Sequence, residues 1–523
     1  METASKADAP TVGEVPAGYV TVREGKATIL QRENEVFYNK AQVINRDMSL
    51  CVLRQFMRTR DKEWQGRKKP KTPVEGWVDE PHPPPPKICE GLAASGLRAI
   101  RYARELEGVG EITANDLDET AVENMKRNIA FNGEEAACIN PNKGDARILM
   151  MQKAKYFDAV DLDPYGSPSI FLDSAVQSIA DGGILLITAT DMAVLCGNNS
   201  EVCWSKYGSY PIRAKYQHEG ALRIVLHAIE AAANKHKRHI RPVLSLSIDF
   251  YVRVFVRVYT SAAAIKITPA KLSYVYQSTG CDAFYLNQVG RVVTKGASTK
   301  YQPGHGPPVG QSCAIAGDRF KYSVGGPYWT EPIHDMEWVS EMLQHIADNK
   351  DLYPAHAKIT SILTTVSEEL PDCPFFVDLH GMSGTLKCTP PPATTFRSAL
   401  VNAGYRCSSS HTNPTGVKTD APMEVLWDIM RCWVKEHAPV KDQGEETAAY
   451  NILAKEPVLV ANFARAHAAM SKAKEKGQAR FLPNPEENWG PKSRHGRPPA
   501  GTLNRKRGAG AAAEGDGEGC KKK

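Results

Sequence analysis

One short segment combines residue types that can hold an exocyclic amino group for reaction. It runs from Phe157 through Asp161 to Asp163-Pro164-Tyr165, where an apolar run typical of a strand ends. The lone pair of a nucleobase amino group is delocalised into the ring, so acceptors must take its hydrogens and hold it in line with an electrophile. The Asp163 carboxylate and the Pro164 carbonyl are two such acceptors, and Tyr165 offers a ring face for an unstacked base. An Asp-Pro turn beside a core tyrosine is the alternative, and Asp161 is equally open to a structural role.

A glycine-containing turn upstream has the position of a nucleotide-binding turn. Glu90-Gly91-Leu-Ala-Ala-Ser-Gly96 follows a strand-like run and opens a helix, where backbone N–H groups favour an anionic or zwitterionic ligand. It lacks the G-x-G-x-x-G dinucleotide fingerprint, and it is no phosphate loop because Leu97 and Arg98 follow the second glycine. Taken alone, a structural turn explains it equally well.

Two acids after the next predicted strands favour the functional interpretation. Asp116 follows roughly 20 residues later, where a carboxylate can accept both hydroxyls of a ribose. Asp145, with Ala146 beside it, follows one strand–helix unit further on. The glycine turn, the ribose acid and the Asp-Ala pair form the layout of a class I S-adenosylmethionine methyltransferase. We therefore predict S-adenosyl-L-methionine as the cofactor.

The elements that must position these residues alternate along the chain from Lys87 to about Tyr259. Short apolar runs separated by helical patterns predict a parallel sheet with right-handed crossovers. The expected fold class is α/β, with a Rossmann-like class I methyltransferase domain, a smaller α+β C-terminal domain and a disordered basic tail. The expected divisions are a disordered segment 1–27, the methyltransferase domain 28–265 with an exposed basic, proline-rich loop 58–86, the C-terminal domain 266–440, and a helical then low-complexity basic tail 441–523.

Composition excludes several classes of protein. The chain has 523 residues, 42% of them hydrophobic, which suits a globular protein of a few domains. Its aliphatic runs fall far short of the roughly 20 apolar residues that span a bilayer, so we expect no membrane association. The 12 cysteines lack a dense spacing pattern, which indicates reduced thiols and not a secreted disulfide scaffold. A net charge of +6 indicates a local basic surface, with simple solubility as the alternative.

Longer blocks of the sequence resemble the tRNA guanine-N2 dimethyltransferase family, whose members modify guanosine 26 at the junction of the D and anticodon arms. The resemblance covers roughly residues 28–430. It is carried, in order, by VFYNKAQVINRDMSL, GLAASGLRAIRYA, DLDPYGSPSIFLDSA, TATDMAVLCG, KYGSYPIRAKYQHEGALRI, GGPYWTEPIHD, FFVDLHGMSGTLK and SSSHTNPTGVKTDAP.

This resemblance implies roles for single residues. Asp163 and Pro164 would hold the target amino group, and Phe37 and Tyr165 would flank the base. Arginine suits the methionyl carboxylate of the cofactor, although a surface salt bridge is the simpler explanation of Arg46 from the residues alone. The cofactor contacts would come from Arg46, Glu90, Gly91, Gly96, Arg98, Asp116, Asp145 and Ala146. The turn Glu90–Ser95 departs slightly from the family's common form.

Many animal relatives in this family carry two Cys-x-x-Cys pairs that would make a four-thiolate zinc site. Here the pairs read Ser278-Thr-Gly-Cys281 and Cys313-Ala-Ile-Ala316, so two of the four ligands are present. A two-thiolate site would need His305 and a further group to complete it. We predict that the chain holds no metal.

The expected partner is tRNA, because guanosine 26 is stacked in a folded RNA and must be extruded into the site. Folded RNA is recognised largely through phosphates, 2′-hydroxyls and shape. Two basic stretches, 58–71 with Trp64 and 492–523 after Trp489, supply lysine and arginine, although each also suits a solvated face.

In the HTNPTGVKTDAP block, His411 and Lys418 are candidate phosphate contacts, with capping or surface roles as alternatives. We expect a monomer. The fragment NRKRG favours the nucleus, and the mitochondrion, chloroplast and cytoplasm stay open.

Two other functions compete with this hypothesis. Asp-Pro-aromatic turns also occur in methyltransferases that act on adenine amino groups of DNA or of another RNA. A non-enzymatic tRNA-folding helper with a lapsed site is the third possibility, but the intact Asp116, Asp145 and Asp163 argue against it.

Overall fold

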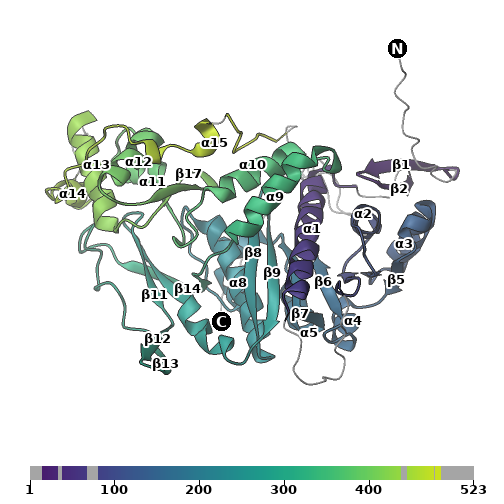
Figure 1. The fold of residues 1–523 in the computed structure, drawn as a ribbon. Helices are drawn as coiled ribbons and strands as arrows, with labels where there is room; N and C mark the ends of the chain where they lie inside the picture. The colour runs from purple at the N-terminus through teal and green to yellow at the C-terminus, as the bar shows by residue number, and fades with distance from the viewer. Residues whose placement is uncertain (1–14, 33–37, 68–80, 438–443, 476, 485–523) are drawn as a thin grey trace, which may run out of the picture.

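The computed structural model describes residues 15–32, 38–67, 81–437, 444–475 and 477–484. A seven-stranded sheet lies at its centre, with the order β5-β4-β3-β6-β7-β9-β8 (Figure 1). Neighbouring strands are parallel from β5 to β7, and β9 runs antiparallel to both β7 and β8. The strands are β3 Lys87–Glu90, β4 Glu111–Asp116, β5 Ile139–Lys143, β6 Phe157–Leu162, β7 Ile179–Ala189, β8 Arg238–Ile248 and β9 Tyr251–Thr260. The order confirms the predicted Rossmann-like sheet.

Both faces of the sheet are covered, as a largely parallel sheet requires. In β7, Ile184 and Leu186 join a core with α1, α2, α9 and α10, whereas Leu185 and Ile187 join a core with α5 and α8. The helices of this part are α1 Val43–Gln65, α2 Leu97–Glu105, α3 Glu119–Phe131, α4 Ala146–Gln152, α5 Leu172–Ser178, α6 Met192–Leu195, α7 Ser200–Tyr207 and α8 Gln217–Lys235, with short 3-10 turns at Lys40–Gln42, Gly133–Ala136 and Ser169–Phe171. None of the described helices is long and apolar enough to cross a bilayer.

The N-terminal segment departs from the sequence prediction. Residues 1–27 were expected to be disordered, but β1 Tyr19–Glu24 and β2 Ala27–Arg32 form an antiparallel hairpin. Ala27, Ile29 and Leu30 are buried in the same core as α1 and α2, which is why the hairpin is ordered.

The segment predicted as an exposed loop, 58–86, begins inside a helix, because α1 continues to Gln65. Three of the cations in its helical part have partners within the protein. Arg58 Nη2 lies 2.9 Å from His345 Nδ1, Lys62 Nζ lies 2.7 Å from Glu341 Oε1, and Arg60 lies 3.1 Å from Asp158. These contacts attach α1 to the rest of the fold, so the loop prediction is wrong for 58–65. The proposed RNA-binding residues 68–71 and 492–523 lie outside the described residues.

The remaining elements build three smaller sheets and a group of helices. The sheets have the orders β11-β10-β14, β12-β13 and β15-β17-β16. Their strands are β10 Leu272–Ser278, β11 Phe284–Gln288, β12 Gly290–Lys295, β13 Ser298–Pro303, β14 Tyr322–Trp329, β15 Val377–Asp378, β16 Cys407–Ser410 and β17 Asn413–Thr419. The helices are α9 Met336–Asp348, α10 His356–Ser367, α11 Leu379–Leu386, α12 Ala393–Asn402, α13 Met423–His437, α14 Ala448–Leu453 and α15 Lys472–Glu475, with 3-10 turns η4 Ala264–Lys271, η5 Lys350–Leu352 and η6 His467–Ala469. Helices α9 and α10 lie after residue 266 and yet share a core with the large sheet. The domain division at 266 therefore stays a prediction.

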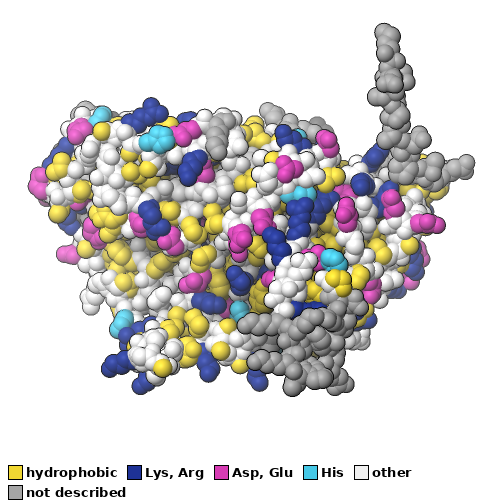
Figure 2. All heavy atoms as spheres, in the orientation of Figure 1, with side chains coloured by type: hydrophobic (Ala, Val, Ile, Leu, Met, Phe, Trp, Pro, Cys, Tyr) yellow, Lys and Arg dark blue, Asp and Glu magenta, His cyan; other side chains and the backbone are white. Residues whose placement is uncertain are grey.

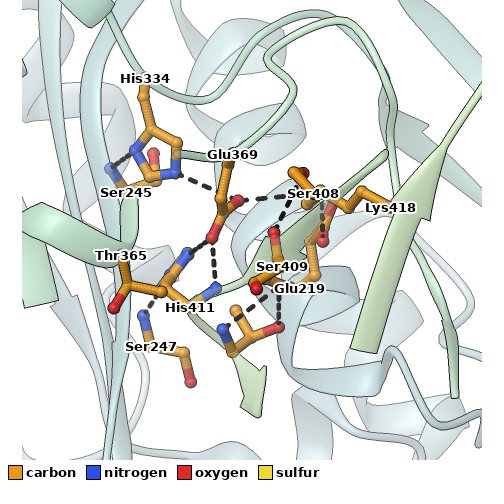
Figure 3. A network of polar contacts seen from close by, with 12 residues as sticks. Glu219, Ser245, Ser247, His334, Thr365, Glu369, Ser408, Ser409, His411 and Lys418 are labelled. Carbon is orange, nitrogen blue, oxygen red and sulfur yellow. Dashed lines mark hydrogen bonds and ion pairs between the residues drawn. The ribbon is translucent and has the colours of Figure 1, made fainter. Parts of the chain in front are cut away.

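A buried polar network joins α8 to β17 and its neighbours (Figure 3). Lys418 Nζ lies 2.7 Å from Glu219 Oε2 and 3.9 Å from Glu369 Oε2. His411 Nδ1 lies 2.7 Å from Glu369 Oε1, and the His411 side chain is only 3% exposed. His411 and Lys418 are therefore anchors between two parts of the chain, which corrects their prediction as phosphate contacts.

The same network places His334, Glu369 and His411 close enough to suggest a metal site. The backbone N–H of Ser245 donates to His334 Nδ1, and that of Ser247 donates to His411 Nε2, each over 3.3 Å. Each ring accepts on one nitrogen, so its N–H lies on the nitrogen that faces Glu369 and offers no lone pair to a cation. The arrangement is a hydrogen-bonded anchor, and the prediction that the chain holds no metal stays a prediction.

Replacing Lys418 by Met should destabilise the protein by about 3–5 kcal/mol. It removes a buried cation that contacts both Glu219 and Glu369, leaving Glu219 with Arg223 and Glu369 with His411 as partners. Lys435 offers a matched control: its ion pair with Glu456 is exposed on both sides, so Lys435→Met should cost less than about 1 kcal/mol. Urea unfolding of the two variants measures both values. Equal effects would show that the buried network does not carry this stability.

Candidate active site

The turn after β6 lies at the edge of the sheet where the parallel strands end. Asp163 keeps 21% of its side chain exposed, Pro164 is buried and Tyr165 is 82% exposed. Thr190, at the end of β7, accepts the backbone N–H of Gly166 over 2.7 Å and donates its own N–H to the Gly166 carbonyl. The turn is thus fixed to the neighbouring strand, and it presents a carboxylate and an open aromatic ring at its surface.

The Asp163 carboxylate is held from one side only. Arg98 Nη2 forms a close ion pair with Oδ2, and Asn45 Nδ2 lies 3.4 Å from the same oxygen. No group of the described residues donates to Oδ1. This oxygen can therefore accept a hydrogen from a bound substrate without loss of an existing contact.

Asp161 lies beneath this carboxylate and is fully buried. It accepts from Arg98 Nη1 and Arg253 Nη2, each over 2.9 Å, and from the Tyr102 hydroxyl over 2.5 Å. Burial opposes its ionisation, but Arg253 and Arg98 outweigh this effect and keep the pKa of Asp161 below its usual value. The sequence left the role of Asp161 open, and its position is structural: it fixes the arginine that contacts Asp163.

The glycine turn packs directly against this site. A Cβ on Gly91 would lie 2.7 Å from Leu162 Cδ2, so any larger residue here would require the buried Leu162 side chain to shift. Gly96 has a φ of +75° and begins α2. Asn115 Nδ2 donates to the carbonyls of Gly91 and Gly144 over 2.9 and 3.0 Å, which ties together the ends of three strands.

The predicted cofactor acids stand at the ends of the next two strands. Asp116 accepts the backbone N–H of Ala94 over 2.8 Å, and Asp145 caps α4 by accepting from Arg147 N over 2.8 Å. Large exposed apolar side chains follow both acids: Leu117 after Asp116, and Ile148 on α4. Carboxylates beside exposed apolar surface fit the ribose and adenine of S-adenosylmethionine. Ala146 is buried in the first turn of α4, and Glu90 is buried at the end of β3.

Arg46 is bound within the protein. Its Nε lies 2.6 Å from Glu24 Oε1, and its Nη2 pairs with Glu24 Oε2 and with the Asn39 carbonyl. Only Nη1 has no partner among the described residues, so the predicted contact with a cofactor carboxylate would have to use this atom. Phe37, the second predicted aromatic residue of the base site, lies outside the described residues.

Four residues of this site were not predicted: Asn45, Tyr102, Asn115 and Arg253. Asn45 and Asn115 each precede a residue that was predicted, so adjacency offered a weak signal. Arg253 offered a stronger one, since an arginine within the apolar run Tyr251–Val258 must find a buried acid.

The two thiols at the positions where the resemblance suggested zinc ligands lie together. Cys281 Sγ and Cys313 Sγ are 3.9 Å apart, and Ser278 Oγ lies 3.4 Å from Cys281 Sγ. Ser278 and Ala316 stand at the other two positions.

The sheet order, the glycine turn and the acids at the strand ends together define a Rossmann-like methyltransferase, which confirms the predicted fold class. Within this class the chain belongs to the N2,N2-dimethylguanosine tRNA methyltransferase family, whose sequence pattern matches residues 18–431. The family predicted from the sequence blocks is therefore confirmed.

Known proteins agree with this assignment. The chain is 53% identical to tRNA (guanine(26)-N(2))-dimethyltransferase 1 of Arabidopsis thaliana, over 92% of this chain and 88% of the relative. It is 43% identical to the enzyme of that name from Mus musculus, over 91% of this chain and 76% of the relative. The solved structure of Trm1 from Pyrococcus horikoshii, in complex with S-adenosyl-L-methionine, is 30% identical with a TM-score of 0.64, covering 78% of this chain and 99% of that chain.

The charge state of Glu90 gives a testable pH dependence. Burial raises the pKa of Glu90 to about 8, with Arg98 opposing and Asp161 adding to the shift. Because this pKa exceeds the unfolded value of about 4.3, the stabilising contribution is complete below that value and is lost as the pH rises through 8. The melting temperature of the cofactor-free protein should fall more steeply between pH 5 and 8 than that of Glu90→Gln, and the two profiles should run parallel above about pH 9. Parallel profiles between pH 5 and 8 as well would contradict this assignment.

Proposed function

We propose that this chain transfers methyl groups from S-adenosyl-L-methionine to the exocyclic N2 of guanosine 26 in tRNA, one and then a second. The observation that carries the proposal is the free Oδ1 of a partly exposed Asp163 beside the glycine turn. Membership of the N2,N2-dimethylguanosine family supports the substrate.

Two acceptors of the turn after β6 hold the amino group in this proposal. Arg98 and Asn45 orient the Asp163 carboxylate, whose Oδ1 accepts one amino hydrogen. The Pro164 carbonyl accepts the other amino hydrogen. Proline has no backbone N–H, so no donor of this residue faces the amino group. Fixing both hydrogens directs the nitrogen lone pair toward the methyl donor. As the N–C bond forms and the S–CH3 bond breaks, the hydrogen held by Asp163 would leave as a proton to this carboxylate. Tyr165 supplies a face for the extruded base, and Phe37 supplies the second.

S-adenosyl-L-methionine, when bound, supplies a methyl group activated by its sulfonium. In our proposal Asp116 accepts the ribose hydroxyls, Asp145 and Ala146 border the adenine, and Arg46 uses Nη1 for the methionyl carboxylate. The remaining contacts come from the turn, through Glu90, Gly91, Gly96 and the start of α2. Arg98 acts indirectly in this arrangement, because both its Nη atoms contact Asp161 and Asp163.

The partner in this proposal is tRNA, bound by a monomer. The nucleus, with the mitochondrion, chloroplast and cytoplasm as alternatives, stays a prediction from the sequence. A relative from Saccharomyces cerevisiae, 33% identical over 90% of this chain and 92% of its own length, is described as mitochondrial.

Replacing Asp163 by Ala should abolish methyl transfer while tRNA still binds, because the amino group loses an acceptor but the RNA surface is unchanged. Incorporation of labelled methyl groups into tRNA, followed by nucleoside mass analysis, measures the reaction and identifies the base. Asp158→Asn on the same strand is the matched control, since Asp158 bonds Lys87 N and Arg60 away from the site. Loss of tRNA binding together with activity would contradict the role of Asp163. Detection of methylated adenosine in place of methylated guanosine would contradict the proposed substrate.

The exposed ring of Tyr165 should act through stacking. Tyr165→Phe keeps the ring face and should retain nearly full activity, whereas Tyr165→Ala should lower kcat/KM by about 5–150-fold, as expected from losing about 1–3 kcal/mol of stacking. Steady-state kinetics with tRNA checks this. Similar rates for the two variants would show that the ring does not support the base.

A further inference from the structure

The hairpin β12–β13, Gly290–Lys295 and Ser298–Pro303, is called the ribbon below. Its two strands pair only with each other, and it projects at the lower left of the molecule beyond β11 and β14 (Figure 1). Its base packs where Gly290 meets Pro269 of η4. Most residues of the ribbon are exposed on both faces. A two-stranded sheet with so little support is only marginally stable in water. We therefore ask whether its exposed side chains have a binding role.

The register gathers the cations of the ribbon on one face. Arg291 pairs with Gln302, Val293 with Lys300, and Lys295 with Ser298. Paired and alternate residues of an antiparallel ribbon share a face. Arg291, Lys300 and Lys295 therefore follow one another on the same side in steps of about 7 Å, two residues of strand each. This is a row of positive charge along an edge of the protein.

Within the described part of the chain, no acid pairs with this row. From 283 to 317 the sequence contains no aspartate or glutamate. None of the three cations forms an ion pair with a described residue, and the one hydrogen bond among their side chains runs from Arg291 Nε to the Pro303 carbonyl. Figure 2 shows lysine and arginine side chains at the lower left of the molecule, where Figure 1 places the ribbon.

The opposite face of the ribbon carries an exposed apolar pair. Val292 and Tyr301 are directly paired and are 39% and 44% exposed. A ribbon with a cationic face and an accessible aromatic ring is suited to nucleic acid, because phosphates form ion pairs with the cations and sugars or bases pack on the ring.

The ribbon lies far from the target nucleotide. Val252, at the start of β9, pairs with Ala189 beside the catalytic turn, and β9 ends at Thr260, shortly before η4. The 10 residues of β9 span about 30 Å. A contact at the ribbon therefore reaches a distant arm of the RNA and not the methylated base.

We propose that the cationic face of the ribbon binds the phosphodiester backbone of a tRNA arm away from nucleotide 26. This rests on the proposed function for the identity of the RNA. The ribbon thereby contributes to tRNA affinity and to the choice of a full-length, folded substrate, and it takes no part in methyl transfer.

The test compares two triple variants of the full chain. R291Q/K295Q/K300Q removes the charges, and R291K/K295R/K300R keeps them. The charge-removing variant should raise the Kd for tRNA at least about 10-fold and lower the slope of log Kd against log salt by about 2–3, as expected for three lost phosphate contacts. The charge-preserving variant should stay near wild type, and kcat at saturating tRNA should be unchanged in both.

An unchanged Kd and salt slope in the charge-removing variant would overturn the proposal, and so would equal losses in both variants, since charge would then not be the cause. Equal melting temperatures of both variants and wild type exclude misfolding as the source of a difference. Failure of the proposed function looks different: the wild-type chain itself would then leave tRNA guanosine unmethylated.

Discussion

The bridge made by the Arg98 guanidinium between Asp161 and Asp163 is the interaction on which the rest of the site depends. One end of the guanidinium is fixed in the core by Asp161, and the other determines where a partly exposed carboxylate points. The surrounding structure serves this bridge: Arg253 reaches Asp161 from the antiparallel strand β9, and Tyr102 reaches it from α2. A carboxylate fixed in this way costs little reorganisation when it receives a substrate.

The antiparallel strand explains why the bridge can be buried. Two carboxylates, Asp161 and Asp163, meet at the end of β6, beside a Glu90 whose raised pKa keeps it mostly protonated near neutral pH. Arg98 alone could not balance them. The insertion of β9 between β7 and β8 brings Arg253 across the sheet, where it also contacts Ser49 and Thr188. The position of β9 in the sheet thus places a second arginine beside Asp161.

Much of this site was predictable because topology brings strand ends together. Asp116, Asp145 and Asp163 each follow an apolar run, and the ends of parallel strands meet at one edge. Residues that act from elsewhere were harder to find. Arg253 belongs to a strand whose neighbours no local pattern specifies. Lys418 and His411 suggested surface groups, because a single sequence does not show that Glu219 and Glu369 lie beside them.

The fold prediction failed where local signals conflicted with composition. Residues 58–65 are rich in charge and suggested a loop, yet their partners on α9 and β6 keep them helical. The N-terminal hairpin was missed although Glu24-Gly25-Lys26 offers a turn in which Gly25 has a φ of +56° between two alternating runs. Short strands beside a polar terminus carry too little pattern to outweigh the expectation of disorder.

The N-terminal hairpin also limits how the chain can be shortened. Glu24 is the shared counter-ion of Arg46 and of the fully buried Arg101, and it accepts the Tyr38 hydroxyl. A fragment that began at residue 28 would contain the whole large sheet and yet leave Arg46 without its acid, while Arg101 would keep only Asp47 and Glu105. The folded unit therefore begins before β3, the first strand of the large sheet along the chain. It must include Glu24, whose carboxylate forms ion pairs with the buried Arg46 and Arg101.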